Sequence, residues 1–119
     1  MEAATPPAVL RAGPVEVRPE ELLALARGRA LTLSVQEFRL LTVLAAAKDR
    51  VVTRDELYRA VWGGPLRPGD RSVDVYVRKL RVKLADALPA FDCIHTHVGF
   101  GYRFHPERSR LFHKTDTPR

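Results

Sequence analysis

Apolar residues recur at helical spacing in three consecutive parts of the chain. The first part begins where Ser34 and Glu37 form an S-x-x-E capping box, a pattern typical of a helix start. The second begins with the same pattern at Thr53 and Glu56, and Gly63-Gly64-Pro65 predicts its end. The apolar residues that we expect on the core side of these two helices are Phe38, Leu40, Leu41, Leu44, Ala45, Leu57, Ala60 and Val61.

The third part, "RSVDVYVRKLRVKL" at positions 71–84, mixes valines with basic residues. Successive helical residues lie about 100° apart around the axis, so we expect a buried arc of Val73, Val77, Leu80 and Leu84. Asp74 and Arg81 then lie on one flank, and Tyr76 and Lys83 lie on the other. The opposite arc holds Arg71, Val75, Arg78, Lys79 and Val82. Asp70 or Ser72 can cap this helix, which we expect over about 70–87, with its end at Pro89.

Strand-like patterns flank the three helices. In the N-terminal part, "PVEVR" and "ALTL" alternate, and Pro14, Pro19-Glu20-Glu21 and Gly28-Arg29 separate the runs as turns would. "LLALAR" at 22–27 suits a strand or a short helix, and we favour the strand. In the C-terminal part, "DCIHTHV" and "YRFH" flank Gly99-Phe100-Gly101 and predict a β-hairpin. Helices packed with small antiparallel sheets predict an α+β fold.

Composition and charge narrow the class of partner. The 119 residues suit one domain, and a formal net charge of +6 with a pI near 10.1 favours nucleic acid or, second, an anionic membrane surface. Positions 70–83 hold 5 basic and 2 acidic residues, and 103–119 hold the same numbers. The single cysteine, Cys93, excludes an intrachain disulfide and favours a reducing compartment. Without a long apolar run or a signal peptide, we expect a soluble intracellular protein.

The outward arc of the third helix has two features that a merely solvated basic face does not explain. Only Asp74 is spaced to pair with Arg78 at i,i+4, so ladders of exchanged charges are missing. Exposed Val75 and Val82 have no role in solubility. In a major groove, arginine can bind guanine, lysine can bind phosphate or guanine, and valine can contact a thymine methyl. The face therefore favours nucleic acid.

Several separated motifs together resemble a known family. "LTLSVQEFRLLTVLAAAKDRVVTRDELYRAVWG", "RSVDVYVRKLRVKL" and "IHTHVGFGYRF" occur in the order found in the winged-helix DNA-binding domain of OmpR/PhoB-type response regulators. The resemblance covers about Val9 to Phe104. It implies a winged helix-turn-helix: an N-terminal four-stranded antiparallel sheet, three helices and a C-terminal hairpin, the wing. It also implies sequence-specific binding of double-stranded DNA by a bacterial transcription regulator, one domain per half-site and in tandem pairs.

The resemblance also implies roles for individual residues. The third helix would enter the major groove, and Arg71, Val75, Arg78, Lys79 and Val82 would face bases or nearby phosphates. Phosphate contacts would come from Trp62, Tyr76, Arg81, Thr96, Tyr102 and Arg103, although Trp62 and Tyr102 could instead be packing residues. The loop that touches RNA polymerase in the family corresponds to Gly63, Gly64, Pro65, Leu66, Arg67, Pro68 and Gly69, which could also be a simple connection.

The sequence departs from the family pattern in two places. The wing usually reads T-V-R-G-x-G-Y, whereas here Val98 replaces the arginine that can reach the minor groove, so we expect a weaker minor-groove contribution. His97 or Arg103 could partly substitute. Positions 1–8 cannot hold a receiver domain, so we expect a stand-alone DNA-binding domain or a fragment of a longer protein.

Other functions are less well supported. Cys93, His95 and His97, with His105 or His113, could bind a metal, but their spacing is not a common metal pattern and we expect none, nor any other cofactor. Nucleophile, phosphate-loop and paired-carboxylate motifs are missing from the sequence, so we expect no enzyme. The main alternative is a winged helix that binds protein through its third helix. A membrane role lacks a free amphipathic basic helix.

We therefore predict a flexible N-terminus at 1–8, a winged-helix domain at 9–105 and a basic flexible tail at 106–119. The protein would be a monomer alone, would pair on DNA, and would reside in the cytoplasm with the nucleoid.

Overall fold

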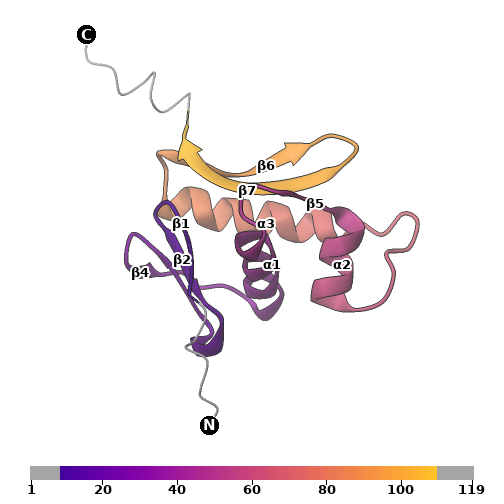
Figure 1. Ribbon diagram of the computed structural model, residues 1–119, viewed down its shortest axis with the longest axis horizontal. Coiled ribbons are helices and arrows are strands. Elements are labelled where there is room, and N and C mark those ends of the chain that lie inside the picture. Colours follow the sequence, from indigo (N-terminus) through magenta and orange to yellow (C-terminus); the bar gives the residue numbers. More distant parts are fainter. Residues whose placement is uncertain (1–8, 110–119) are drawn as a thin grey trace.

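The computed structural model describes residues 9–109 (Figure 1). Our expectations of flexibility at 1–8 and 110–119 lie outside the described residues. In chain order the elements are β1 (Leu10–Ala12), β2 (Val15–Arg18), η1 (Pro19–Glu21), β3 (Leu23–Ala26), β4 (Arg29–Ala30), α1 (Val35–Ala46), β5 (Val51–Thr53), α2 (Arg54–Trp62), α3 (Ser72–Ala87), β6 (Phe91–His97) and β7 (Gly101–Arg108).

The N-terminal part forms a four-stranded antiparallel sheet in the order β1-β2-β3-β4. The strand interpretation of 22–27 is confirmed by β3, because its alternate residues Ala24 and Ala26 are buried. The expected turn at Pro19–Glu21 is a short 3-10 helix, η1, that ends at Leu22 in the left-handed region (φ 53°). The strand expected over 30–33 is wrong beyond Ala30, since Leu31 and Leu33 pack toward the core instead.

Both predicted capping boxes are present. At α1 the Glu37 N–H donates to Ser34 Oγ (3.2 Å) and the Ser34 N–H donates to Glu37 Oε1 (2.8 Å). Thr53 and Glu56 form the same pair of bonds at α2, with lengths of 3.0 and 2.8 Å. These reciprocal bonds satisfy backbone donors that a helix start leaves open. The predicted core residues are buried or partly buried except Ala60, which is exposed because α2 turns Leu57 and Val61 inward instead.

Helix α3 confirms the division of the valines. Val73, Val77, Leu80 and Leu84 are buried, as the arc analysis predicts. The expected cap takes a different form: Arg71 is the N-cap residue and makes no side-chain cap, while Asp70 Oδ1 accepts from the Ser72 N–H at 2.8 Å.

The wing sheet contains one strand that the sequence did not reveal. Its order is β5-β7-β6, so the short β5 before α2 pairs with the returning strand of the hairpin. A Cβ at Gly101 would overlap the Val52 carbonyl oxygen, and this close approach requires glycine. Strand β7 continues to Arg108, past the expected domain end at 105, because it pairs with the start of β6.

One core connects all of these layers. Figure 1 shows the hairpin lying along one side of α3, with α1, α2 and the N-terminal sheet on the other side. The buried side chains of both sheets and all three helices form a single cluster, which includes Val17, Leu41, Leu57, Leu80 and Phe104. Within residues 9–109, we find no helix that is long and apolar enough to cross a membrane.

Candidate nucleic-acid interface

The outward face of α3 carries the five residues predicted to face bases. Arg71, Val75, Arg78, Lys79 and Val82 are all exposed. Arg78 makes no hydrogen bond or ion pair to any residue within 9–109, and Arg71 Nε lies 3.8 Å from Asp74 Oδ2. Lys79 Nζ lies 4.6 Å from the centre of the Tyr76 ring. The face thus presents cations and small apolar groups toward solvent, and Val82 also lines a groove beside β4.

The i,i+4 pair that the spacing of Asp74 and Arg78 allows does not form. The Asp74 carboxylate instead accepts two bonds from Arg54 at the start of α2, with lengths of 3.1 and 2.8 Å. It also accepts a 2.6 Å bond from the Tyr102 hydroxyl of the wing. Burial acts to raise the pKa of Asp74, but these hydrogen bonds outweigh it and lower the pKa. Asp74 therefore joins α2, α3 and the wing, and Arg78 and Lys79 are left without an acidic partner within residues 9–109.

Tyr102 is 8% exposed, and its hydroxyl is committed to Asp74. Burial, and then the bond to Asp74, raise the pKa of this tyrosine to about 12. These observations favour the packing role for Tyr102 over a phosphate contact.

Arg81 lies on the same flank of α3 as Asp74 and binds the wing from there. Its guanidinium donates to the Ile94 carbonyl (3.2 and 2.9 Å) and to Thr96 Oγ1 (2.6 Å), and it lies over the Tyr102 ring. Arg103, also predicted to contact phosphate, donates from Nε to His97 Nε2 at 3.1 Å. The wing is thereby fixed to α3 at both of its strands: Arg81 of α3 bonds to β6, and Tyr102 of β7 bonds to Asp74 of α3.

An aromatic cluster holds the end of α2 against α3. The Trp62 ring stacks on Tyr58 at a centroid distance of 5.3 Å and meets Tyr76 edge-on at 5.4 Å. Trp62 is half-buried, and its indole N–H has no acceptor within residues 9–109. A packed ring with a free N–H donor at the surface suits both the packing role and the phosphate contact considered for Trp62.

The loop from Gly63 to Gly69 connects α2 with α3. Gly63, Gly64 and Gly69 all have positive φ, and every residue of the loop is exposed except Leu66. The Leu66 N–H donates to Asp55 Oδ1 at 3.3 Å, which holds the loop to α2. The hydrogen bond from Arg59 and then that from Leu66 lower the pKa of Asp55.

The other flank of α3 is fixed by a buried carboxylate. Lys83 Nζ lies 2.6 Å from Glu37 Oε1, which is also the cap acceptor of α1. Burial acts to raise the pKa of Glu37, but Lys83 and the Ser34 N–H outweigh it and lower the pKa. The outward face of α3 is therefore held in place from both flanks.

The histidines considered as metal ligands have other partners, and the cysteine is buried. His95 Nε2 lies 2.8 Å from the His105 carbonyl oxygen, and His97 accepts from Arg103. Cys93 is buried, and burial, followed by the nearby Asp92, raises its pKa to about 12. Among residues 9–109 we find no group of three or more such side chains that could hold a metal. His113 lies outside the described residues.

Sequence reasoning missed Arg54 and the Glu37–Lys83 pair. Arg54 had a usable signal: it is the first residue of α2, where a cation opposes the helix dipole unless an acid lies nearby. The pairing of Glu37 with Lys83 had no comparable signal, because these residues lie far apart in the chain and meet only after the helices pack.

A hairpin fixed beside an exposed basic helix defines a winged-helix domain of the nucleic-acid-binding type. A family model described as "Transcriptional regulatory protein, C terminal" matches residues 28–104, and the chain belongs to this family. The predicted resemblance to OmpR/PhoB-type domains is therefore confirmed. This family is one of regulators rather than an enzyme class.

Individual relatives agree with this assignment. The alkaline phosphatase synthesis transcriptional regulatory protein SphR of Synechococcus elongatus is 38% identical over 102 residues, which cover 86% of this chain and 40% of SphR. The chain thus spans less than half the length of that relative. The DNA-binding domain of CpxR from E. coli superposes with a TM-score of 0.75 and 32% identity, covering 82% of this chain and 96% of that one.

A second solved structure is the Klebsiella pneumoniae RstA DNA-binding domain in complex with the RstA box. It superposes with a TM-score of 0.74 and 30% identity, and the match covers 83% of this chain and 98% of that domain.

Proposed function

We propose that this chain binds double-stranded DNA sequence-specifically as the effector part of a bacterial transcription regulator. Helix α3 enters the major groove, and the β6-β7 wing lies at the adjacent backbone or minor groove. The observation that carries the proposal is the outward face of α3, where Arg78 and Lys79 have no acidic partner and stand beside exposed Val75. Desolvated base edges and phosphates complement such a face.

The residues divide by role. Base contacts come from Arg71, Val75, Arg78, Lys79 and Val82, of which the last lies nearest the N-terminal sheet. Trp62, through its free indole N–H, and Tyr76 contact phosphate from the α2–α3 junction. Arg81 and Thr96 are hydrogen-bonded to each other, so their main role is to position the wing. They contact phosphate only through N–H and O–H groups that this bond does not use. Arg103 likewise binds phosphate through the guanidinium N–H groups that do not donate to His97.

Two substitutions separate these roles. Arg78→Ala should change sequence preference, because a good bidentate contact discriminates between bases by about 1–3 kcal/mol. Arg81→Ala should weaken binding to all sequences alike. Arg18→Ala, which removes one cation from β2 in the N-terminal sheet, is the charge-matched control. Selection from a random DNA library, followed by titration of the enriched and scrambled duplexes, measures both effects; an unchanged preference in Arg78→Ala would contradict the base-reading role.

The main alternative is a protein-binding winged helix, and salt separates the two. Binding through several phosphates should weaken steeply between about 50 and 200 mM salt. A failure to bind DNA, or DNA binding that does not change with salt, would favour the protein-binding alternative. Within the DNA proposal, Val98→Arg should strengthen binding by restoring a minor-groove cation, and no gain would contradict a weakened wing.

Four wider proposals follow from family membership. The exposed loop Gly63–Gly69 contacts RNA polymerase, and Arg67 supplies its charge. Two copies bind adjacent half-sites as a tandem pair. The protein acts in the cytoplasm, on the nucleoid, and needs no cofactor.

A further inference from the structure

One face of the wing sheet holds every histidine that residues 9–109 contain. On the opposite face, Thr96 of β6 and Tyr102 of β7 bond to α3. Because side chains alternate along a strand, the residues next to these two point away from α3. The His95 and His105 rings lie 6.1 Å apart on this side. We call the set that points away from α3 the outer wing face: His95, His97, Arg103 and His105.

His97 differs from the other two histidines in the kind of bond that it makes. Arg103 Nε donates to His97 Nε2 at 3.1 Å, and a guanidinium can only donate. The lone pair of Nε2 therefore accepts this bond, and the ring proton of neutral His97 is on Nδ1. A second proton can bind only at Nε2. Protonation of His97 and its bond to Arg103 therefore exclude each other.

His95 and His105 can take a second proton without losing their bonds. His95 Nε2 lies 2.8 Å from the His105 carbonyl oxygen, and His105 Nδ1 lies 2.6 Å from Asp49 Oδ1. A carbonyl and a carboxylate only accept, so these two ring nitrogens already carry protons. Glu107 lies 3.6 Å from His105 Nε2 and 4.0 Å from His95 Nε2, where it stabilises added charge on either ring. These histidines therefore serve as internal controls for His97.

The charged neighbours of His97 are basic. Strand β5 contributes no charged residue to the sheet, and within residues 9–109 no carboxylate pairs with His97. The two carboxylates of the outer wing face belong to His95 and His105, as described above. The basic groups nearest His97 are His95 on the same strand, Arg103 on β7 and, behind the sheet, Arg81 of α3, which is bound to Thr96. A second proton on His97 thus leaves two adjacent cations without a counter-ion.

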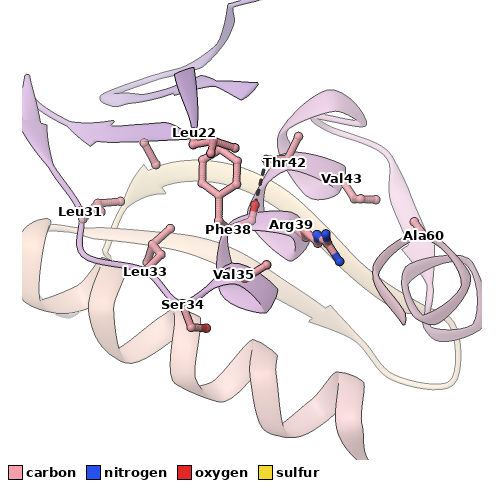
Figure 2. Close-up of a pocket in the computed structure, with 11 residues that line it drawn as sticks. Leu22, Leu31, Leu33, Ser34, Val35, Phe38, Arg39, Thr42, Val43 and Ala60 are labelled. Atoms are coloured by element: carbon pink, nitrogen blue, oxygen red, sulfur yellow. Dashed lines mark hydrogen bonds between the residues drawn. The ribbon is translucent and has the colours of Figure 1, made fainter. Parts of the chain in front are cut away.

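The groove beside α1 has the opposite chemistry. Figure 2 shows the Phe38 ring at its centre, below Leu22, and within residues 9–109 Arg39 is the only charged residue that lines it. The Thr42 hydroxyl at its edge donates to the Phe38 carbonyl at 2.8 Å. An apolar groove with a single cation is a poor site for a phosphate, whereas paired cations on the outer wing face suit one.

We propose that His97 and Arg103 form a proton-operated clamp for one DNA phosphate beside the wing. Neutral His97 holds Arg103. Protonated His97 releases it, and the imidazolium and the guanidinium then both donate to the same phosphate. The phosphate removes the repulsion between the two cations, so proton uptake and phosphate binding strengthen each other. Histidine is the side chain that changes charge between about pH 5 and 8, so the clamp closes on mild acidification.

The clamp rests on the proposed function, which places the wing at the DNA backbone. It also specifies when the wing compensates for the arginine that Val98 replaces in the pattern T-V-R-G-x-G-Y. At neutral pH one guanidinium, partly occupied by His97, faces the backbone. In acid two free cations face it, and the wing carries one more positive charge.

DNA titrations at about pH 7.8 and about pH 5.8 test the clamp on the duplex that library selection enriches. One added phosphate contact steepens the slope of log K against log salt by about 0.9, which corresponds to about 5-fold in affinity near 0.15 M salt. Wild-type protein should show both changes on acidification. His97→Gln keeps an acceptor for Arg103 but cannot ionise, so it should show neither. His97→Lys, charged at both pH values, should bind at the higher pH as tightly as wild type binds at the lower.

His95→Gln and His105→Gln are the matched controls, because each removes a histidine from the same face. Both should keep the wild-type gain in acid. A gain that His97→Gln retains, or that both controls lose, overturns the clamp. Wild-type binding that does not change with pH overturns the clamp and leaves the proposed function intact. A failure of the wild type to bind DNA at either pH overturns both.

Nitrogen NMR of the free protein tests the release of Arg103 without DNA. At about pH 7.8 the His97 ring should be in the Nδ1–H form and the His95 ring in the Nε2–H form. The chemical shift of the Arg103 Nε–H should then change in step with protonation of His97, and in His97→Gln it should stay constant. Inorganic phosphate added in acid should shift the His97 and Arg103 signals more than that of His95. An Arg103 signal that does not follow His97 overturns the clamp whatever the outcome with DNA.

Discussion

Gly101 offers the clearest test of how the wing is built. A methyl group at this position would overlap the Val52 carbonyl oxygen and approach Thr53 Cα to 2.8 Å, and both atoms are backbone. Neither can move without separating β5 from β7, since Gly101 pairs directly with Thr53. The φ of 154° adds a second penalty. Gly101→Ala should therefore cost more than about 4 kcal/mol, the exceptional range for one substitution.

Gly99→Ala is the matched control because it lies in the same turn. Its φ is also positive, at 83°, but an added Cβ meets nothing within 4 Å. Only the left-handed conformation is penalised, at about 1–2 kcal/mol. For a domain of this size 1 kcal/mol corresponds to roughly 4–8 °C in Tm. Calorimetry should show a drop of about 4–16 °C for Gly99→Ala and at least about 16 °C for Gly101→Ala. Equal drops would refute the argument that backbone approach, rather than φ, requires Gly101.

Three further predictions concern titratable groups. Lys83→Met should destabilise by about 1–2 kcal/mol in urea unfolding at pH 7, less than a fully buried pair because the Lys83 side chain is 38% exposed. Because the pKa of Glu37 is lowered in the folded protein, Glu37 stabilises the fold above its ordinary pKa of 4.5, and this stabilisation is lost as pH falls through the lowered pKa. At pH 3.5, Lys83→Met should therefore reduce the free energy of unfolding by less than it does at pH 7. An equal reduction at both pH values would contradict this linkage. Absorbance titration near 295 nm should show one of the 3 tyrosines, Tyr102, ionising at about pH 12, and Asp74→Asn should bring that midpoint down. Cys93, with its pKa raised to about 12, should react with a thiol reagent only on unfolding, and rapid labelling of the native protein would show that it is not buried.

Local chemistry explains what the sequence could predict. Capping boxes, glycine stops and helical spacing act within a few residues, so the three helices and the buried arc of α3 were predictable. Strand β5 was not, because three residues of "VVT" acquire a partner only when Gly101 arrives from the other end of the chain. The same holds for the site. Spacing placed Arg78 and Lys79 outward, but it could not reveal that Asp74 pairs with Arg54 and Tyr102, since those partners lie 20 and 28 positions away.

The aromatic cluster at the α2–α3 junction has a practical consequence. Trp62 is the only tryptophan in the sequence, and it lies between Tyr58 and Tyr76, next to the outward face of α3. Its emission therefore reports on one place in the molecule, and excitation energy absorbed by either neighbouring tyrosine can pass to it. A ligand that desolvates the indole or shifts Tyr76 changes that emission directly. The protein thus contains its own optical probe for occupancy of the α3 face, with no label attached.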